Sequence, residues 1–186
     1  MEKSVSFPLV MKTTTVITLA LTVGFIWLYR HFPTDWILSS AITTGTTFYH
    51  FSMRLVVGTI VPRCIRQPMN RRWFHQKSFE PKLYESLRVK RWKDHMPTYD
   101  PASFSFRENT FAQIVDNCCV SEAVHETIIL FSFLPLLFTF FWGAFPVFLI
   151  TSLLAAAFDS CFVIMQRYNR PRLVQILSKK EAKARE

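Results

Sequence analysis

The sequence predicts an all-α, polytopic membrane protein with about four transmembrane helices and a cytoplasmic amphipathic helical segment. Half of the 186 residues are hydrophobic, 19 are Phe and only 4 are Gly. The apolar residues form runs longer than a soluble domain of this size needs. The net charge of +9 is therefore interpreted with a membrane in mind, because Lys and Arg beside the inner headgroups set topology. We expect no nucleic-acid partner, and the 4 Cys have no metal-ligand spacing.

The first predicted span covers residues 13–29, an uncharged run that ends in Trp27 and Tyr29 and is followed by Arg30. Aromatic residues followed by a cation are typical of the membrane–water interface. A cleaved signal peptide is the competing interpretation. No small-x-small cleavage pattern directly follows the apolar run, so we predict a retained anchor.

The second predicted span covers residues 36–61 and is closed by Pro62. It contains His50 and Arg54, which are four residues apart and so share one face of a helix. An Arg at the centre of a span costs about 2.5 to 3.5 kcal/mol on insertion scales, so we expect these side chains to face protein or water. The alternative for Arg54 is that it extends to the headgroups.

Residues 62–115 form the one large polar segment, with ten Lys and Arg between positions 63 and 93. The loop between the first two spans has only Arg30 as a full cation. The excess of positive charge places residues 62–115 and both termini in the cytoplasm of a multi-pass protein. Within this segment, Pro81 to Lys93 predicts an amphipathic helix that lies on the membrane or caps the spans.

The third and fourth predicted spans cover residues 121–142 and 145–165, with a tight outer turn at 143–146. The third carries Glu122 and His125 in its first turns, and the fourth carries Asp159 near its inner end. Residues 173–186 predict a short, charged, solvated helix. The whole chain, residues 1–186, is predicted to be a single membrane domain.

These spans place ionisable residues from three helices at a similar depth in the cytoplasmic half of the bilayer. They are His50, Arg54, Glu122, His125 and Asp159. The simpler interpretation is that they only join helices, at about 0.6 to 2 kcal/mol per contact. We predict a functional site, because such contacts require fewer ionisable groups than two His, an Arg, a Glu and an Asp. Within this site we expect Arg54 to pair with Asp159 or Glu122.

A His beside a carboxylate at the membrane surface suits general-base catalysis. We predict His125 as the base that takes a proton from a hydroxyl attacking a thioester, with Glu122 orienting the ring and His50 nearby. Arg54 and Arg167 would stabilise the oxyanion or bind a phosphate. The basic residues of the cytoplasmic side suit the phosphates of coenzyme A, although topological anchoring alone also explains them: Lys90, Lys93, Arg167, Arg170 and Arg172.

Two stretches resemble a known family. One is the run from Phe162 to Leu173, with Gln166-Arg167-Tyr168-Asn169-Arg170 at its centre, and the other contains Phe79-Glu80, Leu83-Tyr84, Val89-Lys90 and Trp92-Lys93-Asp94. Both are similar to the glycosyl-4,4′-diaponeurosporenoate acyltransferase family. Two positions depart from its pattern, Asp159 in place of Asn and Cys161 in place of Pro.

The resemblance implies fatty-acyl transfer to a sugar hydroxyl of a glycosylated carotenoid in a bacterial cell membrane. Acyl-CoA from the cytosol is the expected co-substrate, with no resident cofactor or metal. Membrane lipids and pathway enzymes are the expected partners. Substrate-binding residues are expected at Asp159, Gln166, Arg167, Tyr168, Asn169, Arg170, Lys90, Trp92 and Lys93.

Two alternatives stay open. The acceptor can be another glycolipid, or the protein can be a non-catalytic membrane subunit that binds lipid headgroups or scaffolds a lipid or pigment pathway.

Overall fold

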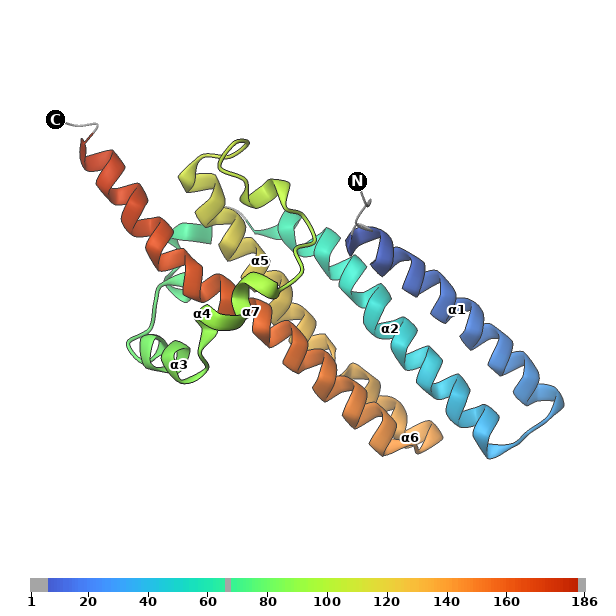
Figure 1. Cartoon of the computed structure of the whole chain (residues 1–186). Helices are drawn as coiled ribbons and strands as arrows, with labels where there is room; N and C mark the ends of the chain where they lie inside the picture. Colours follow the sequence, from blue (N-terminus) through green and yellow to red (C-terminus); the bar gives the residue numbers. More distant parts are fainter. Residues whose placement is uncertain (1–6, 66–67, 184–186) are drawn as a thin grey trace. The chain divides into compact units, whose positions relative to one another are not determined.

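The computed structural model describes residues 7–65 and 68–183, and within them the protein is helical with no β-strand. Residues 66–67 of the predicted polar segment and 184–186 of the predicted tail lie outside the described residues. The long helices are α1 (Phe7–His31), α2 (Asp35–Cys64), α5 (Phe111–Phe131) and α7 (Phe145–Lys183). Short helices and turns connect them: η1 (Pro68–Asn70), η2 (Arg72–Phe74), α3 (Glu80–Ser86), α4 (Val89–Trp92), η3 (Lys93–His95), η4 (Ala102–Phe104), η5 (Leu134–Phe138) and α6 (Thr139–Trp142) (Figure 1).

The chain forms two compact units. Unit 1 contains the described residues up to 59 together with 127–158, and unit 2 contains those of 60–126 and 159–186. The boundaries between the units fall within α2, α5 and α7. The organisation of the chain as a single membrane domain stays a prediction.

Unit 1 consists of hydrophobic helices. In α1 and α2, many Ser and Thr hydroxyls donate to the backbone carbonyl four residues earlier, as Thr22 does to Thr18 (2.7 Å) and Thr46 to Ile42 (2.7 Å). These internal bonds satisfy the hydroxyls without water, so polar residues are tolerated in apolar helices. The two helices run side by side in opposite directions (Figure 1). Gly45 of α2 faces Thr22 of α1, where a Cβ atom would lie 3.4 Å from the Thr22 side chain.

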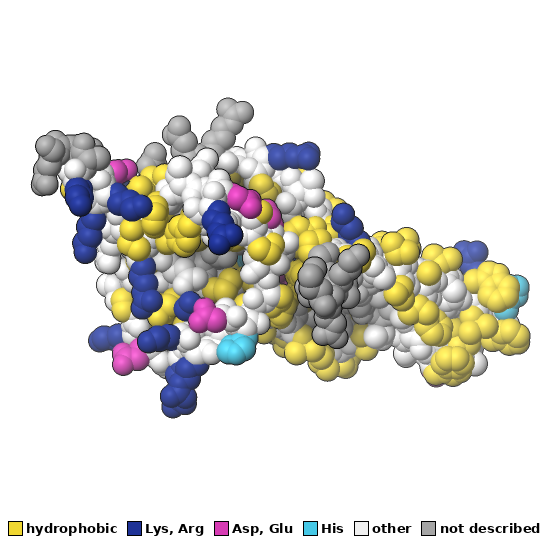
Figure 2. Space-filling model, turned by 45° about the horizontal axis from the view of Figure 1, so that its top comes forward, with side chains coloured by type: hydrophobic (Ala, Val, Ile, Leu, Met, Phe, Trp, Pro, Cys, Tyr) yellow, Lys and Arg dark blue, Asp and Glu magenta, His cyan; other side chains and the backbone are white. Residues whose placement is uncertain are grey.

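The surface of unit 1 is dominated by apolar side chains such as Val16, Ile17 and Leu154, each more than half exposed. Figure 2 shows this hydrophobic surface, whereas Lys and Arg gather on unit 2. Within the described residues, three stretches have the length and apolarity to cross a membrane: Phe7–His31, Phe111–Trp142 and Phe145–Lys183. The all-α membrane fold is therefore confirmed.

The helix α2 is not among those three stretches. Its 30 residues give it enough length at about 1.5 Å per residue, but Ser, Thr and Arg dilute its hydrophobicity. That α2 forms a fourth span stays a prediction. It also continues past Pro62, the predicted end, to Cys64.

The third predicted span lies on α5, which begins at Phe111 because Thr110 and Gln113 cap it. That its membrane part begins near Ser121 stays a prediction. The backbone N–H of Thr110 donates to the Gln113 side chain (2.8 Å) and that of Gln113 donates to the Thr110 hydroxyl (3.3 Å). The helix then ends at Phe131 instead of running to 142, because Pro135 lacks an N–H and a 3₁₀ turn follows.

Predictions were made for the segments at both ends of α7. The predicted turn at 143–146 is confirmed by positive φ angles at Gly143 (65°) and Ala144 (48°), and its place on the outer side stays a prediction. At the other end, the described part of the predicted tail helix is helical, and it continues α7, which is one helix of 39 residues that passes through Pro171. The ammonium of Lys180, near its end, lies 4.0 Å from the ring centroid of Phe111, so α7 stays packed against the start of α5.

The predicted helix from Pro81 to Lys93 is also wrong, because it is broken into α3 and α4. Arg88 adopts a left-handed conformation (φ 50°) directly after the α3 C-cap. Its N–H bonds the carbonyl of Glu85 (3.0 Å), which closes α3 in the way that a C-terminal left-handed residue commonly does. The inward side of this segment contributes Tyr84 and Val89 to the core of unit 2, together with Val115 and Cys119 of α5.

Candidate active site

The candidate site lies in unit 2, where α7 packs against α5. Side chains three or four residues apart share one face of a helix. On α7 this face consists of Asp159, Phe162, Gln166 and Arg170, all of them buried. A polar face of this kind inside a protein requires partners for every charge.

His125 of α5 is bound to Asp159 of α7. The His125 Nδ1 and the Asp159 Oδ1 are 2.8 Å apart, and the carboxylate is 1 % exposed. The imidazole is stacked on Phe162, with ring centroids 4.4 Å apart and ring planes 4° from parallel. The carboxylate and the aromatic ring together fix the orientation of the imidazole.

This arrangement leaves the second ring nitrogen of His125 available. An ionised Asp159 accepts a hydrogen bond from Nδ1–H, so the neutral ring has its lone pair on Nε2. No group in the described part of the chain hydrogen-bonds Nε2, and the side chain is 20 % exposed. A neutral, oriented imidazole with an accessible Nε2 can accept a proton from a hydroxyl.

Glu122 lies one turn before His125 and is fully buried, but its carboxylate is ion-paired with two arginines. Its Oε1 is 2.7 Å from Arg167 Nε, and its Oε2 accepts from Arg170 Nη1. Arg170 also lies over the Phe74 ring, 5.5 Å from its centroid. The prediction that Glu122 orients His125 is therefore wrong, since Asp159 holds that position.

Arg167 extends this network to the polar segment between α2 and α5. Its Nη1 donates to Glu80 of α3, and its Nη2 donates to the carbonyl oxygen of Trp73 (3.0 Å). Together with the bond to Glu122, every nitrogen of this guanidinium has a protein partner. Sequence reasoning missed Glu80 as a partner of Arg167, although it is a buried acid within the most basic part of the chain.

Tyr84 and Trp73 add two further hydrogen bonds to this network. The Tyr84 hydroxyl donates to Glu80 (2.8 Å), and the indole N–H of Trp73 donates to Glu126 (2.9 Å). Burial, followed by the hydrogen bond to Glu80, raises the pKa of Tyr84. The phenol therefore stays protonated and acts as a donor at physiological pH.

The remaining residues of the signature string have separate contacts. The Gln166 side chain donates to the Ser121 hydroxyl (3.3 Å), and Tyr168 packs edge-on against Tyr84 with centroids 5.5 Å apart. Asn169 is half-buried. These contacts hold α7 to α3 and α5. Substrate contact by Gln166, Arg167, Tyr168, Asn169 and Arg170 stays a prediction.

The predicted phosphate-binding residues divide into groups. Lys90 and Arg172 line one groove of unit 2, whereas Arg167 and Arg170 are bound to Glu122. Lys93 is paired with Asp94 (2.7 Å), whose pKa this hydrogen bond lowers. Trp92 donates through its indole N–H to the carbonyl of Leu87 (3.0 Å).

His50 and Arg54 belong to unit 1. His50 is buried and packs edge-on against Tyr49, with centroids 5.5 Å apart. Arg54 donates to the carbonyls of His50 (2.8 Å) and Ala155 (3.4 Å). Their predicted meeting with Glu122, His125 and Asp159 stays a prediction.

Comparison with known proteins gives one match. No curated protein and no solved structure matches the chain. The profile of the CrtO family, glycosyl-4,4′-diaponeurosporenoate acyltransferase, matches residues 70–179. This range is more than half of the chain and includes α3, α5, the described site of unit 2 and nearly all of α7. The chain therefore belongs to the glycosyl-4,4′-diaponeurosporenoate acyltransferase family and is a membrane acyltransferase of carotenoid biosynthesis.

Proposed function

We propose that this protein is an O-acyltransferase that moves a fatty acyl group from acyl-CoA to a sugar hydroxyl of a glycosylated carotenoid or a related glycolipid. The observation that carries the proposal is the pair of His125 and Asp159, with the imidazole stacked on Phe162 and its Nε2 accessible. We further propose a multi-pass protein of the bacterial cell membrane with both termini in the cytoplasm.

In the proposed reaction, His125 Nε2 accepts the proton of the sugar hydroxyl as its oxygen attacks the thioester carbonyl. The carbon–oxygen ester bond forms and the carbon–sulfur bond breaks. The imidazolium returns its proton to the departing thiolate, so that free CoA leaves as the thiol. Asp159 stabilises the imidazolium between these two steps.

The arginines have different places in this proposal. Arg167 and Arg170 are paired with carboxylates, so we assign them to positioning α7 against α3 and α5. Arg54 as the group that stabilises the oxyanion, and His50 as a member of the site, stay predictions from the sequence.

The proposal is tested by lipid mass spectrometry of cells that supply the glycosylated carotenoid. Loss of a general base lowers the rate by about 10²–10⁴-fold, so His125→Ala should remove most of the acylated product at equal protein level. His95→Ala, at an exposed position of η3, is the matched control and should behave as wild type. Unchanged product in His125→Ala would eliminate its role as the base.

Asp159→Ala, which removes the acceptor for Nδ1–H of His125, separates a positioning role from a structural one. We expect kcat to fall by up to about 10⁴-fold, the size of the loss when the Asp that orients a catalytic His is replaced, with little change in KM for the acceptor. Purified protein in detergent, with matched thermal melting curves, provides the measurement. A rise in KM with unchanged kcat would contradict the assignment.

A further inference from the structure

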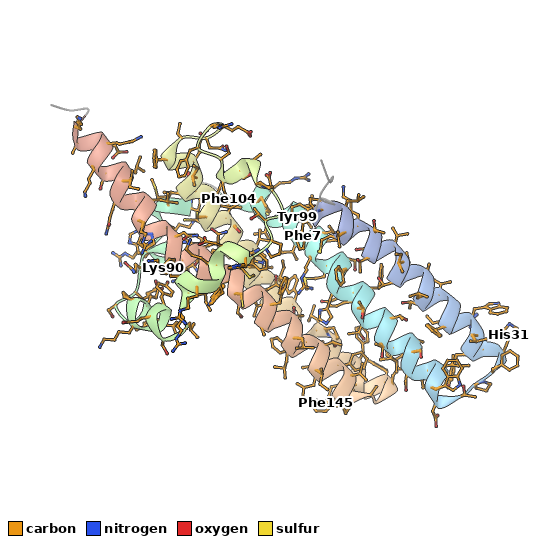
Figure 3. All side chains as sticks on the ribbon, in the orientation of Figure 1. Phe7, His31, Lys90, Tyr99, Phe104 and Phe145 are labelled. Carbon is orange, nitrogen blue, oxygen red and sulfur yellow. The ribbon has the colours of Figure 1, made fainter. Side chains whose placement is uncertain are left out.

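A basic groove in unit 2 contains none of the residues that act on the reacting atoms in the reaction proposed above. It has a volume of about 590 Å³ and lies between α3, α4 and the C-terminal half of α7, where Figure 3 labels Lys90. This volume is within the usual range for small-molecule sites, about 300 to 1,000 Å³. Its charged lining consists of four cations, Arg88, Lys90, Arg91 and Arg172, and one carboxylate, Glu85.

The groove is separate from the His125 site. An α-helix turns by about 100° per residue. Pro171, Arg172 and Gln175, which line the groove, therefore lie on the side of α7 opposite to Asp159 and Phe162. The same helix thus presents one face to the imidazole and the other face to the groove.

The charges of the groove are not balanced, in contrast to those of the neighbouring network. In the network, Arg167 and Arg170 are matched by Glu80 and Glu122. In the groove, four cations have one acidic neighbour among the lining residues. Positive charges that serve only as topological anchors need to face the membrane surface, but they do not need to converge on one concave site.

Part of the groove is already ordered for binding. The Arg172 guanidinium lies 4.9 Å from the centroid of the Tyr168 ring and donates to its hydroxyl oxygen (3.1 Å). Tyr168 packs against Tyr84, which is buried. The left-handed Arg88 turns the chain between α3 and α4, so residues on both sides of the turn line the groove. A guanidinium held in this way loses little entropy when it binds an anion.

We propose that this groove binds a phosphate ester. Clustered Arg and Lys side chains recognise phosphate through charge-assisted hydrogen bonds. Two sources share this chemistry, the phosphates of CoA and the headgroup of an anionic phospholipid. Only the CoA source rests on the proposed function.

The test uses the full chain in non-ionic detergent and in lipid nanodiscs. Lys90→Gln/Arg172→Gln removes two groove cations, and Lys82→Gln/Lys179→Gln removes two exposed cations that do not line the groove. Loss of a charge-assisted contact weakens binding by about tenfold. The groove variant should therefore bind its ligand at least about tenfold more weakly than the control variant, and thermal melting verifies that both are folded.

One arm measures binding of CoA and of dephospho-CoA by equilibrium dialysis. The other arm measures, by native mass spectrometry, retention of phosphatidylglycerol against phosphatidylcholine. A selective loss in the first arm identifies a soluble phosphate, and a selective loss in the second identifies a lipid headgroup. Equal behaviour of the two variants in both arms, or no binding by wild type in either, would overturn the proposal.

Both arms are repeated with His125→Ala. Binding that survives in this variant while acyl transfer is lost separates the groove from the reaction. If acyl transfer also survives, the proposed base fails while the phosphate site stands.

Discussion

At the residue scale, His125 has two carboxylates within reach of its helix face, and the buried surroundings decide between them. Glu122 is three residues away in sequence, but its carboxylate is ion-paired with Arg167 and Arg170. Asp159 is on another helix and contacts the imidazole directly. Sequence spacing alone favours the nearer acid, because it does not show which arginines neutralise that acid.

The same residues predict the effect of removing Glu122. Glu122→Gln leaves the buried Arg170 without a carboxylate and Arg167 with Glu80 alone, so the free energy of unfolding should fall by about 3 to 5 kcal/mol. Glu126→Gln, which alters only a partly buried acceptor for the Trp73 indole, should cost about 1 kcal/mol. SDS-driven unfolding in mixed micelles, followed by tryptophan fluorescence, measures both.

A double variant examines the physical reason for that loss. Glu122→Gln/Arg170→Met removes one of the two arginines that depend on Glu122, so it should be less destabilised than Glu122→Gln alone. The cycle is completed by the single variant Arg170→Met. If the double variant loses as much free energy of unfolding as the two single variants together, the ion pair contributes no coupling energy.

At the element scale, the sequence located the apolar helices well but misplaced several of their ends. Hydropathy identifies residues 13–29 and 145–165 because lipid-facing helices are apolar over most of their surface. It does not show that α5 begins at Phe111, since that depends on the hydrogen bonds between Thr110 and Gln113. It also cannot show that α7 continues through Pro171, because packing outweighs the missing hydrogen bond.

The break between α3 and α4 has a testable origin in Arg88. A left-handed conformation costs a non-glycine residue about 1 to 2 kcal/mol, which glycine avoids. Arg88→Gly should therefore leave the fold intact and raise the free energy of unfolding by up to about 1 kcal/mol, because glycine also makes the unfolded chain more flexible. The same SDS titration measures this change.

The β-branched replacement provides the contrast at the same position. Arg88→Val removes the same charge but is strained at positive φ, so it should destabilise the fold. If the glycine variant is the less stable of the two, the α3 C-terminus is not limited by backbone strain.

At the scale of the whole molecule, the distribution of charged residues along the sequence was more informative about the polar segment than the hydropathy was. Ten Lys and Arg between positions 63 and 93 predicted a polar cytoplasmic segment. In the structure several of these residues lie around one groove. The sequence could not show which cations pair with acids and which remain unmatched, because Glu80 meets Arg167 across 87 residues of chain.

The number of spans determines on which sides of the membrane the two termini lie. If α2 crosses the membrane with the three stretches of sufficient apolarity, the count is even and both termini lie on one side. The positive charge that follows α2 predicts that this side is the cytoplasm. If α2 lies along the surface, three crossings remain and the termini lie on opposite sides.

Green fluorescent protein fused to each terminus in bacterial cells should fluoresce in both fusions, because it does not fold when exported through the general secretion pathway. Alkaline phosphatase at the same positions should be inactive. A fluorescent fusion at one end with an active phosphatase at the other would show that α2 does not cross.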